Sequence, residues 1–416
     1  MNRWLVTALA AGVVMGAGAA QAQETIKFGL LVPQEGVFTD PGNDVIRLFK
    51  MALDEHDNEV AGKKIEWVIG PSDATPDTAV RQARKLVEQD NVDIIIGPLS
   101  GSEGIAMRDY AKTVPDKTII NGTSAAQETT WVDPAPNFFR FNTDGAQWGY
   151  GLGSYVVNEK GWTRVATVAA DYSFGYTNFL GFALDFCQAG GEIVDRHWTP
   201  LGNSDFASVI AALPDDVDAI YLGLGATDAL NFLNQYEQAG GDANLIGGSI
   251  LADQSVLSAK GQAKQMLIGT PMSGSQADDW QDENWQAFVQ RYRDAYPESE
   301  RYSSPSLYAT NYYNATVAAL IALEEVGGDL SDGQEKFRTA LAKVELDAPN
   351  GKITLDENRQ AIGSTFITEV VEGDDGNLVN TFVSKADNVN QTLGMSPEEF
   401  RAIGLPGRDT PECATN

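Results

Sequence analysis

The sequence predicts an α/β protein with two similar lobes, each built on a mainly parallel sheet with helices on both faces. Apolar runs of strand length alternate with amphipathic runs of helix length, which is the pattern of repeated βαβ units. This alternation stops near 141–145 and then starts again. Each run has the size of one domain, so we expect two lobes rather than one large sheet.

The first run supplies the elements of the first lobe. Its apolar segments show little polar alternation, as expected for strands that are covered on both faces. The expected strands are 25–32, 64–69, 92–96 and 118–120, and the expected helices are 44–60, 76–89 and one that begins near Gly101.

The second run and the last third of the chain repeat this rhythm. The second run predicts strands at 164–169, 192–197 and 219–222 and helices at 176–188, 206–213 and 228–238. The last third predicts helices at 284–296, 306–326 and 335–344, followed by strands at 351–355, 364–371 and 378–383. Because these late elements must join lobes that earlier segments began, we expect the chain to cross between the lobes more than once.

Residues 1–22 have the three-part layout of a secretory signal peptide. A short start with Asn2 and Arg3 precedes an uncharged run rich in Ala, Val, Leu and Gly, which ends at Ala20-Gln21-Ala22. The alternative is a membrane anchor, but the run is short for a bilayer. We therefore expect cleavage after Ala22, a mature start at Gln23, and an exported protein.

The composition argues against several classes of function. A formal net charge of −29 disfavours nucleic-acid binding, which depends on clustered Lys and Arg. The two histidines, His56 and His197, lack the spacing of a zinc helix, and no G-x-S-x-G, CxxC or G-x-x-x-x-G-K-[ST] motif is present. Adjacent carboxylates such as Asp215-Asp216 are expected by chance among 58 acidic residues. We expect no enzyme activity, no metal and no cofactor.

Cys187 and Cys413 are the only cysteines. In an exported protein an even number of cysteines suggests a disulfide. Such a bond would tie the C-terminal tail to a helix in the middle of the chain. The alternative is two unpaired thiols.

Two hydroxyl-rich loops of small residues follow neighbouring strands of the first lobe. Strand 92–96 runs into Gly97-Pro98-Leu99-Ser100-Gly101-Ser102, and strand 118–120 runs into Asn121-Gly122-Thr123-Ser124-Ala125. Doubly wound folds bind ligands at the carboxyl ends of their strands, and the first N–H groups of a helix can bind a carboxylate. The two loops therefore predict a cradle for an anion or an amide. The alternative for Ser100 or Ser102 is a helix N-cap with no ligand.

These loops belong to an ordered set of motifs that resembles the type I periplasmic binding proteins, in the branch of the leucine/isoleucine/valine-binding receptors of ABC importers. Besides the two loops, the set contains Phe28-Gly29-Leu30-Leu31-Val32, Glu35-Gly36-Val37-Phe38, Phe138-Phe139-Arg140, Asp171-Tyr172-Ser173-Phe174-Gly175, Asp205-Phe206, Tyr221-Leu222-Gly223 and Gly351-Lys352-Ile353-Thr354-Leu355-Asp356. It spans essentially all of the mature chain.

The resemblance implies two Rossmann-like lobes joined by a three-crossover hinge, with a solute held between them. The first lobe would comprise 23–142 and 271–355, the second 143–270 and 356–390, and residues 391–416 would form a C-terminal tail. The ligand carboxylate would be held by Ser100, Gly101, Ser102, Thr123, Ser124 and Ala125. Tyr172 and Phe174 would close from the second lobe, and Phe38 would face the cleft. The alternative is that Tyr172 and Phe174 pack in the core of the second lobe and do not face the cleft.

Two departures from the family pattern bear on the ligand. Amino-acid receptors of this family offer an acidic residue to the ligand ammonium, and the matching position here is Ser249. Because a buried ammonium without an anionic partner is strongly unfavourable, either Asp253 replaces the acid or the ligand is not an α-amino acid. Gly225 stands where a tyrosine is usual, which would enlarge the pocket for an aromatic or branched acid.

The resemblance thus implies a periplasmic receptor, expected to be a monomer, that captures a small carboxylate-bearing solute by lobe closure. It would deliver this solute to the permease subunits of an ABC importer. The alternatives are an exported sensor for a membrane signalling partner and a secreted hydrolase, which the scarcity of histidine disfavours.

Overall fold

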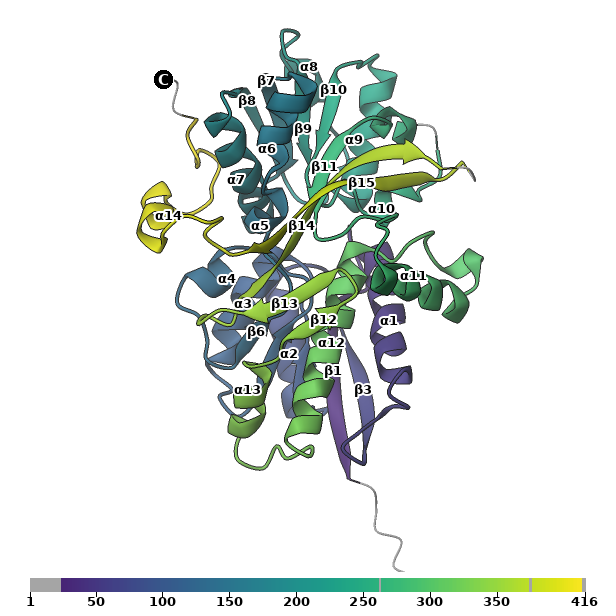
Figure 1. The fold of residues 1–416 in the computed structure, drawn as a ribbon, viewed down its shortest axis with the longest axis vertical. Helices are drawn as coiled ribbons and strands as arrows, with labels where there is room; N and C mark the ends of the chain where they lie inside the picture. Colours follow the sequence, from purple (N-terminus) through teal and green to yellow (C-terminus); the bar gives the residue numbers. More distant parts are fainter. Residues whose placement is uncertain (1–23, 262, 374–375, 414–416) are drawn as a thin grey trace, which may run out of the picture.

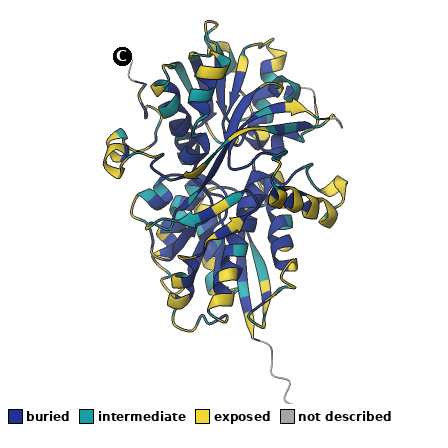
Figure 2. Cartoon of the chain, viewed as in Figure 1, coloured by how far each residue is buried: buried dark blue, intermediate teal, exposed yellow. Residues whose placement is uncertain are grey.

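The computed structural model describes residues 24–261, 263–373 and 376–413. Two α/β lobes lie one above the other along the long axis of the molecule (Figure 1). Buried residues make up the interior of both lobes and also the region where the lobes meet (Figure 2). The predicted signal peptide and the mature start at Gln23 lie outside the described residues. No helix in the described part of the chain is long and apolar enough to cross a membrane.

The first lobe is built on a six-stranded sheet in the order β2-β3-β1-β4-β5-β6. All neighbours are parallel except the short edge pair β2 and β3. The strands are β1 (Thr25–Pro33), β2 (Glu59–Val60), β3 (Lys63–Ser72), β4 (Ile94–Ile96), β5 (Thr118–Asn121) and β6 (Phe138–Arg140).

Helices cover both faces of this sheet because its strands are apolar on both faces. Leu31, Ile95 and Ile119 belong to one buried cluster, whereas Leu30 and Ile120 belong to another on the opposite face. The helices of this lobe are α1 (Thr39–Asp54), α2 (Pro76–Glu88), α3 (Gly101–Ala111), α4 (Glu128–Trp131), α11 (Glu283–Ala295), η3 (Glu298–Glu300), α12 (Leu307–Glu325) and α13 (Glu335–Leu341).

The second lobe contains the parallel strands β8-β7-β9-β10-β11, extended by the antiparallel strands β14 and β15. Its strands are β7 (Arg164–Ala170), β8 (Glu192–Thr199), β9 (Ala219–Gly223), β10 (Asn244–Gly247), β11 (Pro271–Gly274), β14 (Ala361–Glu372) and β15 (Leu378–Val389). Its helices are α5 (Gly145–Gly149), α6 (Leu152–Tyr155), η1 (Val156–Lys160), α7 (Ser173–Gln188), α8 (Ala207–Ala212), α9 (Ala226–Gln238), α10 (Gln254–Leu257) and η2 (Ala263–Leu267).

The chain passes between the lobes three times: after β6, after β11, and between β13 (Gly351–Leu355) and β14. Strand β12 (Leu346–Ala348) pairs with β13, and β13 pairs with the start of β14, so a ladder of hydrogen bonds connects the lobes. Strand β11 belongs to the second sheet, whereas the sequence-based boundary placed residue 271 in the first lobe. Strand β11 has only four residues, Pro271–Gly274. This is too short for the sequence pattern to show that the strand pairs with β14 in the second sheet.

The crossovers surround a buried ion pair. The guanidinium of Arg140 lies 3.7 Å from the carboxylate of Asp144, and both side chains are fully buried. Burial lowers the pKa of Arg140 to about 10 and raises the pKa of Asp144. Gln391 donates to Asp144 over 2.8 Å, which brings the C-terminal segment into the hinge.

One predicted helix is wrong over its last turns. The expected helix 44–60 ends at Asp54, and Glu59–Val60 forms β2 instead. Asp57 and Asn58 between them have positive φ angles of 54° and 55°, a left-handed conformation that ends a helix and that Asp and Asn tolerate better than most residues.

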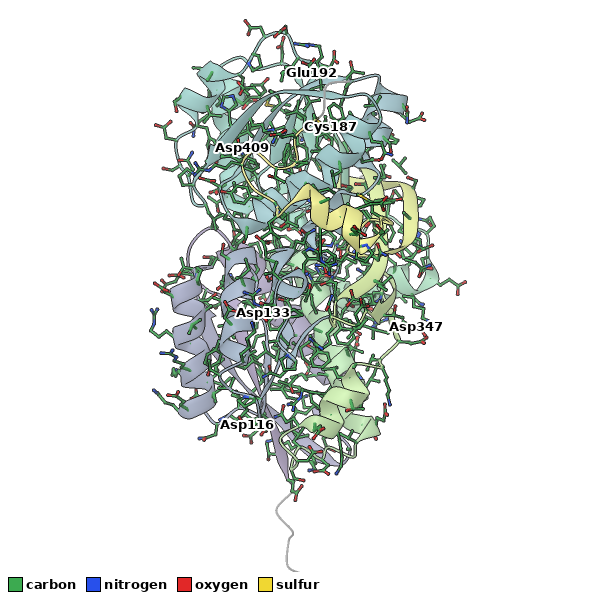
Figure 3. The ribbon with its side chains drawn as sticks, turned by 90° about the vertical axis from the view of Figure 1, so that its left-hand side faces the viewer. Asp116, Asp133, Cys187, Glu192, Asp347 and Asp409 are labelled. Carbon is green, nitrogen blue, oxygen red and sulfur yellow. A yellow bond between two sulfur atoms is a disulfide. The ribbon has the colours of Figure 1, made fainter. Side chains whose placement is uncertain are left out.

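The C-terminal segment leaves β15, forms α14 (Pro397–Ile403) on the outside of the hinge, and ends on the second lobe. Cys187 in α7 and Cys413 are joined by a disulfide, with Cα atoms 5.4 Å apart, which confirms the predicted pairing. Figure 3 shows Cys187 and Asp409 on the same lobe.

Candidate functional site

The predicted site segments meet at the junction of the two lobes, at the carboxyl ends of the strands of both sheets. Helix α3 begins after β4 of the first lobe and α7 begins after β7 of the second. A Cβ atom at Gly101 would lie only 2.8 Å from the Cβ of Phe174. The hydroxyls of Ser102 and Ser173 are 3.2 Å apart. The lobes are therefore closed on each other at this point.

The starts of α3 and α7 point their N–H groups toward the same junction. The backbone N–H groups of Gly101, Ser102, Ser173 and Phe174 have no hydrogen-bond acceptor within the described residues. Tyr172, the N-cap of α7, makes no side-chain capping bond. Each helix start carries a partial positive charge, so the closed junction favours a bound anion.

Ser100 is committed to capping α3. Its hydroxyl accepts from the Glu103 N–H at 3.3 Å and donates to the Ala74 carbonyl at 2.8 Å. The Glu103 carboxylate accepts from the Ser100 N–H at 2.8 Å, which completes a capping box. The hydroxyl of Ser100 therefore holds the loop, and its neighbours Gly101 and Ser102 reach the second lobe.

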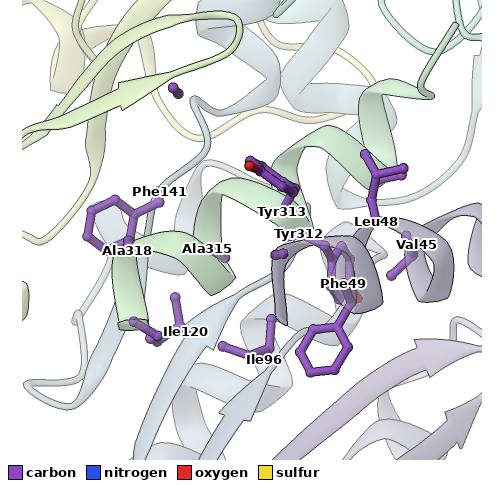
Figure 4. Close-up of a cluster of buried hydrophobic side chains, with 14 of the residues drawn as sticks. Val45, Leu48, Phe49, Ile96, Ile120, Phe141, Tyr312, Tyr313, Ala315 and Ala318 are labelled. Atoms are coloured by element: carbon purple, nitrogen blue, oxygen red, sulfur yellow. The ribbon is translucent and has the colours of Figure 1, made fainter. Parts of the chain in front are cut away.

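The loop after β5 is shaped by close packing. A Cβ at Gly122 would lie 2.1 Å from the ring of Tyr312, so this position requires glycine. Figure 4 shows Tyr312 in a cluster of buried hydrophobic side chains that also contains Ile96 and Phe49. The hydroxyl of Tyr312 donates to the Leu31 carbonyl at 2.8 Å. Helix α12 thus fixes the loop from below.

The three predicted residues of this loop have different surroundings. Thr123 is buried and its hydroxyl accepts from the Asn311 amide at 2.8 Å, which leaves the hydroxyl proton available to a ligand oxygen. The hydroxyl of Ser124 lies against α3, because a Cβ at Gly104 would be 1.8 Å from it. The Ala125 carbonyl accepts from the Gly145 N–H at 2.8 Å across the hinge.

Aromatic side chains from both lobes line the junction. The rings of Tyr172 and Phe174 are 5.9 Å apart, and Phe174 also packs on Trp148. In the first lobe the ring of Phe38 lies 5.7 Å from that of Tyr308. Phe38, Tyr308 and Phe174 belong to one buried cluster and Tyr172 packs against it, so the lobes share an apolar core at their contact.

Tyr308 is a candidate that the sequence analysis missed. It is the second residue of α12, is buried, and its hydroxyl has no hydrogen-bond partner among the described residues. Burial, with a contribution from the nearby Asp253 carboxylate, raises its pKa well above the ordinary value. The sequence around Ser306 and Tyr308 has the pattern of a buried helix. It therefore gave no sign that Tyr308 would reach the junction.

Ser249 and Asp253 lie on the second-lobe side, in different roles. The Ser249 hydroxyl is buried and unpartnered within the described residues, and its N–H donates to the Asn178 side chain at 3.2 Å. Asp253 caps α10, and its two oxygens accept from the Ser255 and Leu307 N–H groups, each at 2.8 Å. Asp253 therefore connects the second lobe to the start of α12 in the first.

The expected enlargement of the pocket at Gly225 does not occur. A Cβ at Gly225 would lie 2.7 Å from the terminal methyl of Ile250. The space left by the missing ring is filled by this side chain, which is buried in the shared cluster. The glycine and the isoleucine therefore compensate each other in volume.

Three buried carboxyl groups surround the junction. Burial raises the pKa of Glu103 to about 7 and those of Asp228 and Asp253 to about 6. Each of these carboxyl groups accepts a hydrogen bond from at least one backbone N–H group. The donors are Ser100 for Glu103, Gly202 for Asp228, and Ser255 and Leu307 for Asp253. These groups maintain the frame of the site. Among the described residues no group of His, Cys, Asp and Glu could hold a metal ion.

Comparisons with known proteins agree with this architecture. The family model for periplasmic binding proteins matches residues 25–377. The Leu/Ile/Val-binding protein homolog 6 of Brucella melitensis is 26% identical over 405 residues, covering 93% of this chain and 98% of that protein.

Solved structures share this fold. A solute binding protein of an ABC transporter from Rhodopseudomonas palustris, in complex with 3,4-dihydroxybenzoic acid, is 27% identical with a TM-score of 0.80, covering 88% of this chain and 98% of that one. The branched-chain amino acid transporter substrate binding protein of Streptococcus pneumoniae, in complex with isoleucine, is 20% identical with a TM-score of 0.74, covering 87% and 100%. The chain belongs to the type I periplasmic binding proteins, in the leucine/isoleucine/valine-binding branch.

Proposed function

We propose that this protein captures a small carboxylate-bearing solute between its lobes and presents the closed complex to the permease subunits of an ABC importer. It would do so in the periplasm as a monomer, after removal of residues 1–22, and without changing the solute chemically. The observation that carries the proposal is the convergence of two helix starts, at Gly101 and at Ser173, whose N–H groups lack acceptors within the described chain.

In the proposed complex the carboxylate lies beside the contact between these helix starts. The N–H groups around Gly101 and Ser102 donate from the first lobe, and those around Ser173 and Phe174 donate from the second. The Thr123 hydroxyl donates its free proton. Because donors come from both lobes, the ligand stabilises the closed state over the open one.

We assign the rest of the solute to an aromatic acid in preference to an α-amino acid. Ser249 offers no charge to an ammonium, and both oxygens of Asp253 already accept backbone N–H groups. Phe38, Tyr172, Phe174 and Tyr308 supply ring surfaces, which favour an aromatic guest. The relative from Rhodopseudomonas palustris, solved with 3,4-dihydroxybenzoic acid, supports the same class.

A thermal-shift panel tests this function. The mature chain is heated with benzoate, 4-hydroxybenzoate, 3,4-dihydroxybenzoate, leucine, isoleucine and valine, and bound compounds are then recovered and analysed. We expect one or more aromatic acids to raise the melting temperature and to be recovered unchanged. A rise with the amino acids alone would overturn the ligand class. Accumulation of a product over time would overturn the receptor.

A further inference from the structure

The C-terminal segment runs from the hinge to the second lobe. Gln391 is buried in the hinge, where its amide donates to the Gln127 carbonyl at 3.2 Å and to the Thr130 hydroxyl at 3.1 Å. These partners lie in the first lobe, whereas its third acceptor, Asp144, begins the second. The segment therefore starts from a point that touches both lobes.

Helix α14 then packs across the outside of the junction. Phe400 is buried against Ala146 and Leu180 of the second lobe and meets Trp131 of the first in an edge contact, with ring centroids 5.4 Å apart. Arg401 lies over the same Trp131 ring, 4.8 Å from its centroid. The helix is held by side chains of both lobes.

Beyond α14 the segment is bound to the second lobe. The Arg408 carbonyl accepts from the Trp198 indole N–H at 3.2 Å, and the Pro411 carbonyl accepts from Arg196 at 2.6 Å. The Cys187–Cys413 disulfide closes the segment onto α7. The chain around Arg408 is thus fixed on both sides of the residue.

The Arg408 side chain reaches the carboxylate of Asp171 with two nitrogens, one of them 2.8 Å from Oδ1. Hydrogen bonding to this guanidinium is the main cause that holds the pKa of Asp171 below its usual value; burial acts in the opposite direction, and the Tyr176 hydroxyl lowers the pKa further. Asp171 immediately precedes Tyr172 and the start of α7. The ion pair therefore holds the loop that carries Tyr172 and Phe174.

We infer that the disulfide-anchored C-terminal segment, residues 391–413, is a brace that sets the position of the second-lobe loop 171–174, with Arg408 as its positioning residue. The inference builds on the proposed function, since this loop is the part of the second lobe that meets Gly101. An exposed ion pair between two mobile side chains contributes little by itself. An arginine on an immobilised chain has a much higher effective concentration at its partner, so its effect should depend on the disulfide.

The first experiment needs no ligand. Amide hydrogen exchange is measured on the mature chain, on Arg408→Gln, and on the Cys187→Ser/Cys413→Ser double variant, with Arg164→Gln as the matched control. Arg164 also forms an ion pair at the surface of the second lobe, with Glu192 and Asp216, away from the loop. We expect exchange in 171–176 to be faster in the first two variants and unchanged in the control. Unchanged exchange in Arg408→Gln would overturn the inference.

The second experiment measures affinity by calorimetry, with an aromatic acid identified by the thermal-shift panel. Arg408→Gln should weaken binding by about threefold to tenfold through faster dissociation, and it should weaken binding much less when the disulfide is already removed. Equal effects in both backgrounds would show that Arg408 acts without the brace. If no solute binds the unaltered chain, the proposed function fails, while the exchange experiment still decides on the brace.

Discussion

Gly101 of the first lobe lies directly against Phe174 of the second, and a Cβ at Gly101 would be 2.8 Å from the Phe174 Cβ and 2.9 Å from its amide nitrogen. Gly101→Ala should therefore oppose closure. Overpacking costs about 1–3 kcal/mol, so the dissociation constant should rise roughly five- to 150-fold in calorimetry. Because the clash lies between the lobes, the melting temperature of the ligand-free chain should hardly change. Unaltered affinity would mean that the lobes do not meet here in the complex.

Thr123 is predicted to donate its hydroxyl proton to the ligand carboxylate. Thr123→Val keeps the shape and removes the donor, and a hydrogen bond to a charged group contributes about 1.5–3 kcal/mol. Affinity should fall roughly ten- to 150-fold, and Thr123→Ser should restore most of it. Val also loses the bond from Asn311, so Asn311→Ala serves as the control. If Asn311→Ala and Thr123→Val reduce the affinity equally, the Thr123 hydroxyl stabilises the loop through Asn311 and does not contact the ligand.

Glu103 should make the stability of the first lobe pH-dependent. Its pKa is raised from 4.5 to about 7 mainly by burial, so the folded state binds its proton more tightly than the unfolded state does. Its stabilising contribution is complete below about pH 4.5 and is lost as the pH rises through about 7. Glu103→Gln retains the capping pattern and removes the titration. Calorimetric unfolding should show a larger gain in melting temperature for this variant at pH 8 than at pH 5, and a constant difference would contradict the assignment.

Removing the disulfide should destabilise the chain. The bond links residues 226 positions apart, so it restricts a large part of the unfolded chain. The Cys187→Ser/Cys413→Ser variant should lose about 2–5 kcal/mol of unfolding free energy in urea titrations. Arg164→Gln, which alters only an exposed ion pair, should lose less than about 1 kcal/mol. A double variant as stable as the parent would mean that the tail is already held firmly without the bond.

The arrangement of the fold could be predicted because its signals are local and repeated. Buried parallel strands such as β4 (Ile94–Ile96) are apolar runs, and helix α3 starts shortly after this one. The short elements were missed for the opposite reason. Strand β11 and helices α5, α6, α10 and α14 have four to seven residues each, too few for a periodic pattern to emerge. Their place is set by tertiary contacts.

The candidate site was predictable where backbone chemistry defines it. Small residues and hydroxyls after β4 and β5 marked the two loops at the junction. Side-chain direction was not visible in the sequence: Ser124 faces α3, and Ile250 fills the space beside Gly225. Tyr308 reaches the junction from a helix 185 positions beyond Thr123 because α12 packs beneath the loops. Such a contact between distant segments depends on the fold and has no local pattern.

The most direct test of the central claim compares an acid with its amide. The mature chain is titrated with 3,4-dihydroxybenzoate and with 3,4-dihydroxybenzamide, or with the matching pair for whichever aromatic acid the panel identifies, while small-angle scattering follows the radius of gyration. Two helix starts that hold a carboxylate between the lobes predict tight binding and a smaller radius with the acid, and neither with the amide. Equal binding of both compounds, or binding of the acid without compaction, would contradict the account.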